Sequence, residues 1–391
     1  MTLNNNTIQE FPLLWKKVVR ANNLPPCDCA KNCVGSTHEL IITDDFVFVT
    51  GQSMYQVAKF NHQGEKLADY VMPHCSGPHG LQVDNDGALW VSLEFLGFVV
   101  RLDKGGNIDK AIDVNMYPNG NKIAINPAPH CICFDPSTGI MWFTGKRTST
   151  IGKINPDGSV EHFELKSLGA TPIYLSVGPD GNIWGTELTS SKILKINTQI
   201  VKTEEKKAGC CCSTATDEVT NKALKRIADK QQADIIDEYT IPTANARPIA
   251  IIPDPSQRMM WFTEEAGKKV GRIEIDVLDP ETGAPKITEF AVPVLQPNDV
   301  LASLAFDCNN NLWVEVYVDQ NNPNPEGKDY IVQFDASIRD TNNTGTLQIP
   351  FTLHEVPTPK TVMHRIRADK SGKALWFTEL NTDQLGKITI G

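Results

Sequence analysis

The chain has 391 residues, 40% of them hydrophobic, with 27 glycines and 25 prolines, which is typical of a turn-rich globular protein and unlike a disordered or fibrous chain. Its formal net charge of −10 argues against a nucleic-acid or anionic-membrane surface, because either needs a concentrated basic patch. No apolar run approaches the roughly 18 residues of a membrane span, and no signal-peptide pattern opens the chain. We therefore expect a cytoplasmic protein that acts on a small molecule, without nucleic-acid or membrane partners.

In chain order, the first expected strand covers residues 8–13, "IQEFPL". Residues 14–37 follow as a lid-like insertion, which contains Trp15 and the cysteines Cys27, Cys29 and Cys33. Neither this cluster nor the run Cys210-Cys211-Cys212 has the paired C-x2-C spacing of a structural zinc site. We interpret the cysteines as reduced thiols and keep a thiolate metal site as the alternative.

A template then recurs along the chain: a short apolar strand, an Asp or Asn turn, a second strand with one aromatic residue, and a third strand ending as in "IGKI". Repeats of several short strands are typical of propeller blades. A fourth, outer strand such as "DEYTIP" follows six of the units. The aromatic position is occupied in seven units, by Phe48, Trp90, Trp142, Trp184, Trp261, Trp313 and Trp376.

The last unit lacks an outer strand of its own, and the strand at 8–13 supplies it, which closes the ring and removes an exposed edge. The sequence thus predicts an all-β fold, a seven-bladed β-propeller with four-stranded blades in a single domain over residues 1–391. Residues 115–128 and 318–328 are expected on the same face as the lid. Residues 197–237 form an insertion on the opposite face.

The first positions of each inner strand are expected beside the central axis, at the lidded face. Imidazole is the commonest transition-metal ligand and titrates near neutral pH, so converging imidazoles favour a divalent-metal site or an acid–base cluster. The alternative is a histidine inherited from the repeat's ancestor and satisfied by a carbonyl or water. Aligned units place four histidines there, His38, His79, His130 and His364, beside Ile173, Ile249 and Ala302 in the other three.

Carboxylates complete the candidate site. Glu94 lies four residues after its blade's tryptophan and in the same blade as His79, so we expect it to be a ligand or a base. Glu39 should point to the other side of its strand by the period of two and is a weaker candidate. Three glutamates that follow their tryptophans by three residues are interpreted as structural, bonding between blades or capping loops: Glu187, Glu264 and Glu379.

Motifs such as "WFTE", "VGRI" and "DEYTIP" resemble the virginiamycin B lyase (streptogramin lyase) family of seven-bladed propellers over nearly the whole chain. The resemblance implies opening of a cyclic depsipeptide by elimination at an ester, with a histidine base, a magnesium ion and a nearby glutamate. The family's Glu-Pro-His-Gly-Ile motif is matched at Pro78-His79-Gly80-Leu81 with Glu94 at the family spacing, but Gly77 replaces the leading glutamate. A second family histidine, in Arg-Pro-His-Ala-Ile, is replaced by Ile249.

These departures predict a substrate other than the antibiotic. The additional imidazoles shift the expected metal from magnesium toward iron, manganese or zinc. We expect a metal-dependent lyase or isomerase that abstracts a proton from a small ester or carbonyl compound. Its catalytic residues would be His79, Glu94 and His364, and its metal ligands Glu94 and the four ring histidines, with Trp15 and Tyr174 lining or covering the site unless they serve only core packing.

Two alternatives stay open, a four-histidine iron oxygenase and a non-enzymatic binding scaffold. A lactonase-type calcium site, built from Glu, Asn and Asp, fits poorly because this ring is rich in imidazole. The oligomeric state is left open.

Overall fold

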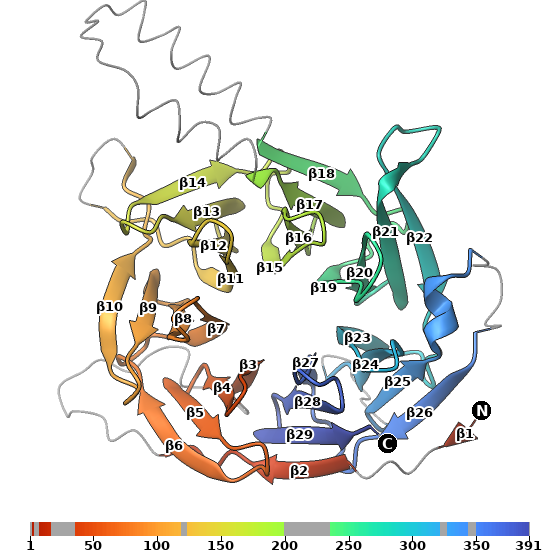
Figure 1. Ribbon diagram of the computed structural model, residues 1–391, viewed down its shortest axis with the longest axis horizontal. Coiled ribbons are helices and arrows are strands. Elements are labelled where there is room, and N and C mark those ends of the chain that lie inside the picture. The colour runs from red at the N-terminus through yellow and green to blue at the C-terminus, as the bar shows by residue number, and fades with distance from the viewer. Residues whose placement is uncertain are drawn as a thin grey trace, which may run out of the picture.

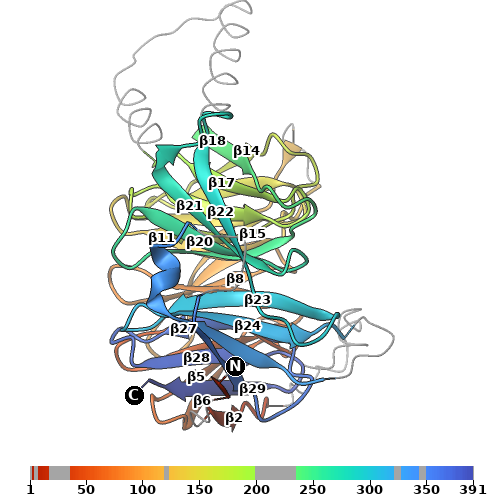
Figure 2. The ribbon, with the colours of Figure 1, turned by 90° about the vertical axis from the view of Figure 1, so that its right-hand side faces the viewer.

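The computed structural model describes residues 2–3, 8–16, 36–118, 123–198, 235–320, 327–342 and 349–390. Seven antiparallel sheets are arranged around a central axis, and their inner strands surround it (Figure 1). Figure 2 shows the same ring from the side. The predicted seven-bladed β-propeller is confirmed.

Each blade begins at the axis with an inner strand and continues outward to a second strand, which carries the aromatic residue of the repeat. The inner strands are β3 (Thr37–Ile42), β7 (Pro78–Val83), β11 (Pro129–Asp135), β15 (Pro172–Val177), β19 (Pro248–Pro253), β23 (Asp299–Phe306) and β27 (Met363–Ala368). The second strands are β4 (Val47–Gly51), β8 (Leu89–Leu93), β12 (Ile140–Gly145), β16 (Ile183–Glu187), β20 (Met259–Glu264), β24 (Leu312–Val318) and β28 (Ala374–Glu379).

The third and fourth strands complete each blade toward the rim. The third strands are β5 (Gln56–Phe60), β9 (Phe98–Leu102), β13 (Thr150–Ile154), β17 (Lys192–Ile196), β21 (Lys269–Leu278), β25 (Tyr330–Phe334) and β29 (Gln384–Thr389). The outer strands are β6 (Lys66–Val71), β10 (Ile108–Asp113), β14 (Val160–Glu164), β18 (Ile236–Thr240), β22 (Pro285–Ala291), β26 (Phe351–Glu355) and β2 (Ile8–Pro12).

The ring is closed by the N-terminal strand β2, which pairs antiparallel with β29 near the C-terminus, as the sequence predicted. Glu10 reinforces the closure, because its carboxylate accepts hydrogen bonds from the backbone nitrogen and the hydroxyl of Thr358, at 2.9 and 2.7 Å. A further short strand, β1 (Thr2–Leu3), pairs parallel with β26 and gives that sheet a fifth strand. A 3₁₀ helix covers Ala336–Arg339.

The core lies between neighbouring sheets and is filled by the aromatic residues of the second strands. Five of the tryptophans, Trp142, Trp184, Trp261, Trp313 and Trp376, are essentially inaccessible to solvent. Several indoles donate a hydrogen bond to an aspartate in the turn between the first and second strands, for example Trp90 to Asp84 at 2.8 Å. In these blades a hydrogen bond therefore joins the buried indole to the turn that follows the inner strand.

Other expectations fall largely outside the described residues. These include nearly all of the lid-like insertion, both cysteine clusters and most of the 197–237 insertion. Cys75 is disulfide-bonded, which contradicts the expectation that the cysteines are reduced, whereas Cys131, Cys133 and Cys308 are free thiols. Within the described ranges, no helix has the length and apolar character needed to cross a membrane.

Candidate functional site

A β-bulge sets the direction of the side chains at the start of every inner strand. In β7, Pro78 pairs with Leu93 but the next pair is Leu81 with Val91, so His79 and Gly80 together face Ser92. The same shift of register occurs near the start of the other six inner strands. A bulge breaks the alternation of side chains and re-aims them. This irregularity positions the histidine ring.

Hydroxyl groups on several of the second strands hold the bulge and also link it to the next blade. Ser92 accepts a hydrogen bond from the backbone nitrogen of Gly80 at 2.7 Å and donates one to the carbonyl of His130 at 3.1 Å. Thr50 makes the equivalent pair of contacts with Glu39 and His79, and Thr378 with Arg365 and His38. The backbones of His38, His79 and His130 are therefore tied to the preceding blade.

The four predicted histidines come together at the face where the inner strands begin, called the histidine face below. The rings of His79 and His130 stack with centroids 3.6 Å apart. His38 lies 5.2 Å from His79 and 5.1 Å from His364, and His79 lies 5.6 Å from His364, again between centroids. The alignment of the repeats thus placed these side chains correctly in space.

Burial lowers the pKa of all four imidazoles. Desolvation is the largest cause in each, and it takes the pKa of His79, His130 and His364 well below 6.5. Neighbouring positive groups act in the same direction, such as Lys146 on His130 and Arg365 on His364. The cluster is therefore neutral at physiological pH, the state in which imidazole binds metals or accepts a proton.

Backbone carbonyls fix the tautomers of two of these rings. Nδ1 of His79 lies 3.0 Å from the carbonyl of His130, and Nδ1 of His38 lies 2.8 Å from the carbonyl of Ser36. Since a carbonyl only accepts, each Nδ1 carries the proton and each Nε2 keeps its lone pair. Nε2 of His79 and Nδ1 of His364 are buried and have no hydrogen-bond partner among the described residues.

Glu94 adds a carboxylate to this group and is itself 6% exposed. Its Oε2 accepts hydrogen bonds from Nε2 of Gln52 at 2.8 Å and from Nδ1 of His130 at 3.1 Å, and its Oε1 lies 3.3 Å from Nζ of Lys146. One ligand atom each from His79, Glu94 and His130 lies within 4.8 Å of the others. Two imidazoles and one carboxylate, with an unpartnered ring nitrogen among them, fit a divalent transition metal.

A buried ion pair lies directly beneath the histidines. Arg365 follows His364 in β27 and pairs with Glu39 of β3, and its guanidinium carbon lies 4.3 Å from the ring centroid of Tyr174 in β15. Since β15 lies across the ring from β27 (Figure 1), this contact joins opposite blades. Burial raises the pKa of the Tyr174 hydroxyl. Tyr174 is 3% exposed and packs against Arg365, and its predicted contact with substrate stays a prediction.

The period of two was misleading for Glu39. It is 1% exposed and contributes charge around His38, because the bulge at residues 38 and 39 breaks the alternation. Sequence reasoning also missed Gln52, Lys146 and Arg365. A signal existed for two of them: Gln52 and Lys146 follow their blade's aromatic residue by four positions, as Glu94 does.

Comparison with known proteins places the chain in a family. Residues 44–321 match the sequence profile of the virginiamycin B lyase family. The chain belongs to the virginiamycin B lyase family. Virginiamycin B lyase of Nocardia farcinica is 26% identical over 209 residues, which are 51% of this chain and 67% of that protein. Family membership supports a lyase.

Solved structures of the virginiamycin B lyase family share the fold. The selenomethionine-substituted lyase of Staphylococcus aureus superposes with a TM-score of 0.66 at 21% identity, over 98% of this chain and 99% of that one. A catalytically inactive histidine-to-alanine variant of the S. aureus lyase with quinupristin gives a TM-score of 0.67 at 21% identity, with the same coverage. At these identities the structural likeness concerns the architecture.

Trp15 lies at the seam between the last and the first blade. Its indole nitrogen donates to Oδ1 of Asp383 at 3.0 Å, and the same oxygen accepts from the backbone nitrogens of Ser36 and Thr37 at 2.7 and 3.1 Å. Gly51 permits this packing, since a Cβ there would lie 2.8 Å from the indole. Trp15 therefore supports the start of β3, which carries His38, and its predicted contact with substrate stays a prediction.

The glutamates three residues after a tryptophan have the predicted structural role where their contacts are defined. Glu187 accepts from the hydroxyl of Ser190 at 2.5 Å and Glu379 from that of Thr382 at 2.8 Å, each within the turn after its strand. Burial raises the pKa of Glu187 to about 7 and that of Glu264 and Glu379 to about 8. The carboxyls of Glu187 and Glu379 therefore hold turns, and none of the three glutamates belongs to the ligand group near the histidines among the described residues.

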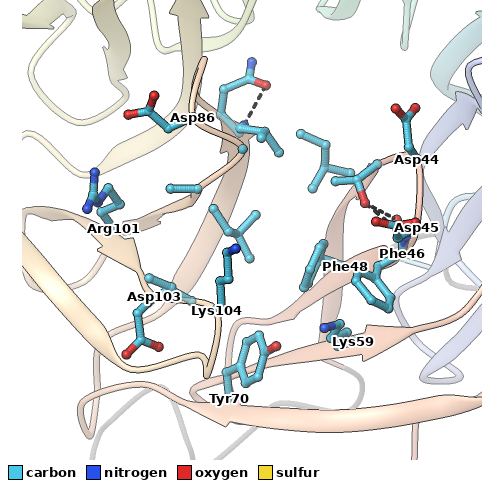
Figure 3. Close-up of a pocket in the computed structure, with 18 of the residues that line it drawn as sticks. Asp44, Asp45, Phe46, Phe48, Lys59, Tyr70, Asp86, Arg101, Asp103 and Lys104 are labelled. Atoms are coloured by element: carbon cyan, nitrogen blue, oxygen red, sulfur yellow. Dashed lines mark hydrogen bonds between the residues drawn. The ribbon is translucent and has the colours of Figure 1, made fainter.

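A groove of about 1050 Å³ opens between the first two blades, at the turns that lie at the other end of the inner strands (Figure 3). Phe46, Phe48 and Tyr70 line it, and the ammonium of Lys59 lies 3.5 Å from the ring centroid of Phe46. Phe48 fills less space than the indole at the equivalent place in other blades. The groove is separate from the histidines.

Proposed function

We propose that this protein is a divalent-metal-dependent lyase or isomerase, which removes a proton next to a carbonyl group of a small ester or carbonyl compound at the histidine face. The observation that carries the proposal is the buried, neutral and unpartnered Nε2 of His79 beside Glu94, at the position that matches the family's histidine motif. Relatives of the family support lyase chemistry.

His79, Glu94 and His130 would hold the ion, because their ligand atoms already form one compact group. A bound divalent ion would supply Lewis-acid stabilisation of the negative charge that develops on the carbonyl oxygen. The resemblance assigns proton abstraction to His79. Since His79 lies within the ligand group, we give that step to His364, whose Nδ1 is likewise buried without a hydrogen-bond partner among the described residues.

In the lyase reaction, His364 accepts the proton from the carbon next to the carbonyl. The electron pair of that C–H bond forms a carbon–carbon double bond, and the ester C–O bond at the adjoining carbon breaks with release of a carboxylate. No water is consumed. Burial lowers the pKa of His364, so the ring is in its neutral, proton-accepting form at neutral pH, although the same shift makes it a weaker base.

The test compares two single variants. We expect His79→Ala to lose a tightly bound Mn²⁺ or Zn²⁺, and His364→Ala to keep the ion while kcat/KM falls at least about 100-fold. Metal content is measured by elemental analysis, and activity by mass spectrometry with cyclic depsipeptides such as quinupristin and with simpler esters. For a cyclic ester, elimination leaves the mass unchanged whereas hydrolysis adds a water. Retention of the ion in His79→Ala would contradict the ligand assignment.

An iron oxygenase is the second candidate. It is favoured by the four imidazoles, because the ring centroids of neighbouring histidines lie no more than 5.6 Å apart. Two histidines and a carboxylate also form the ligand set of many non-haem iron oxygenases. Activity with Zn²⁺ or Mg²⁺, which have no redox chemistry under these conditions, would exclude it. A protein that binds no ion in a His79-dependent manner would instead favour a binding scaffold.

A further inference from the structure

Lys146 lies in the turn between β12 and β13 and reaches the proposed metal ligands. Its ammonium is 3.3 Å from Oε1 of Glu94 and 3.5 Å from Nδ1 of His130. The lysine side chain is 36% exposed, whereas that of Glu94 is 8% exposed. The partly exposed ammonium of Lys146 thus reaches the buried carboxylate of Glu94. The negative charge of Glu94 is therefore balanced without a metal ion.

The neighbours of Glu94 are arranged by the repeat. Gln52, Glu94 and Lys146 occupy the same place in three successive blades, four residues after Phe48, Trp90 and Trp142. Gln52 donates to one carboxylate oxygen and Lys146 to the other. Only Lys146 among these contacts carries a full positive charge, so it is the group that a divalent cation at Glu94 would oppose.

We propose that Lys146 is an internal cation that competes with the divalent metal for Glu94, and that metal binding releases its ammonium toward solvent at the histidine face. The inference rests on the metal site of the proposed function. Two like charges beside one carboxylate repel each other strongly in a poorly solvated site. Because 36% of the Lys146 side chain is exposed and the residue lies in a turn, the ammonium can move to solvent without disturbing the buried strands.

This competition sets a threshold for the ion. Every divalent cation must displace the ammonium of Lys146 from Glu94. An ion that imidazole binds weakly gains too little binding free energy to offset this displacement. Mg²⁺ prefers oxygen ligands and keeps its water shell, whereas Mn²⁺ and Zn²⁺ accept imidazole more readily. The same cost leaves the ratio of the metal affinities unchanged but lowers every affinity, so magnesium, the weakest binder at imidazole, is the first to lose occupancy of the site.

The first test is calorimetric titration of Mn²⁺ into the full chain and two variants. Lys146→Met removes the internal cation, and we expect it to bind Mn²⁺ at least tenfold more tightly than the unchanged protein. Lys192→Met is the matched control, because Lys192 pairs with Glu238 at 3.0 Å in another blade and is similarly half-buried. We expect its Mn²⁺ affinity to equal that of the unchanged protein.

The outcomes separate this inference from the proposed function. Mn²⁺ binding that depends on His79 but is equal or weaker in Lys146→Met overturns the competition and leaves the metal site intact. Binding by Lys146→Met alone supports the competition. Absence of binding by all three proteins overturns both proposals.

A second readout follows Lys146 directly. The rate of its modification by an amine-reactive reagent, measured by peptide mass spectrometry, should rise at least threefold on saturation with Mn²⁺, while that of Lys192 stays constant. A rate for Lys146 that is unchanged or slower with the ion would contradict its release.

Discussion

At the scale of single residues, the site is built from groups whose charge is decided by burial. Desolvation keeps the four imidazoles neutral, and it also favours the neutral form of Glu315. Glu315 lies on its second strand at the position where other blades have the hydroxyl that holds the bulge. Glu315 is fully buried, and its Oε2 accepts from the backbone nitrogen of Ser303 at 3.0 Å. The centre of the ring thus contains a carboxyl that favours its protonated form.

Glu315 predicts a pH dependence of stability. Burial raises its pKa to about 8 from the usual 4.5, so the folded state holds the proton up to about pH 8 while the unfolded state releases it near 4.5. Its stabilising contribution is complete below pH 4.5 and is lost as pH rises to 8, with a slope of at most about 1.4 kcal/mol per pH unit. We expect Glu315→Gln to reduce the pH slope of stability by this contribution in denaturation curves measured between pH 5 and 8, while Glu187, Glu264 and Glu379 keep theirs.

The exposed Glu355→Gln variant is the control for this measurement and should keep the slope of the unchanged protein. If Glu315→Gln kept the same slope as well, the carboxyl would be ionised in the folded protein, contrary to its assigned pKa.

At the scale of elements, the bulge and its hydroxyl connect the strand pattern to the site. Ser92 is inaccessible to solvent and satisfies two backbone groups from two blades. Without it the N–H of Gly80 would be left buried and unpaired, and the carbonyl of His130 would keep only the hydrogen bond from His79. The position of His79 relative to His130 therefore depends on a serine that contacts neither imidazole through its hydroxyl.

We expect Ser92→Ala to lower the free energy of unfolding by about 1–3 kcal/mol, the cost of an unsatisfied buried polar group. Metal affinity should fall with it, because the two rings lose their common support. Ser371→Ala, in an exposed turn, should change stability by no more than about 0.5 kcal/mol. Denaturant titration and metal titration of the same samples check both effects, and an unchanged metal affinity in Ser92→Ala would count against the coupling.

The sequence predicts the fold and the histidines of the site, but not all of the residues around them. Seven aromatic positions and the unpaired outer strand were sufficient for the blade number and the closure, because both are properties of a repeat. The four ring histidines and Glu94 followed from the same alignment. The bulge has no signature in a single strand, so the inward placement of Glu39 could not be predicted. Arg365 was missed because its contact with Tyr174 joins opposite blades, which no local pattern records.

At the scale of the whole molecule, the ring depends on the docking of its N-terminal strand. Leu13 follows β2, is fully buried between the last and first blades, and donates its backbone N–H to the carbonyl of Asp383 at 2.9 Å. Leu14 is 76% exposed. The two leucines therefore form a matched pair for measuring the strength of the closure.

We expect Leu13→Ala to lower the free energy of unfolding by about 2–5 kcal/mol, as for other fully buried leucines. Leu14→Ala should change it by no more than about 0.5 kcal/mol. Chemical denaturation of both variants measures the difference, and equal stabilities would mean that the closure contributes little to the ring.

The seam between the first and last blades has a consequence for biosynthesis. Three of the ring histidines are translated within the first third of the chain, but His364 comes from the final blade, and β2 must wait for β29 before it can pair. A ribosome-bound chain can complete six blades and still lack a quarter of its imidazoles. The docking of His364 beside His38 and His79 therefore follows the synthesis of the last blade, whereas His79, Glu94 and His130 are all translated within the first third of the chain.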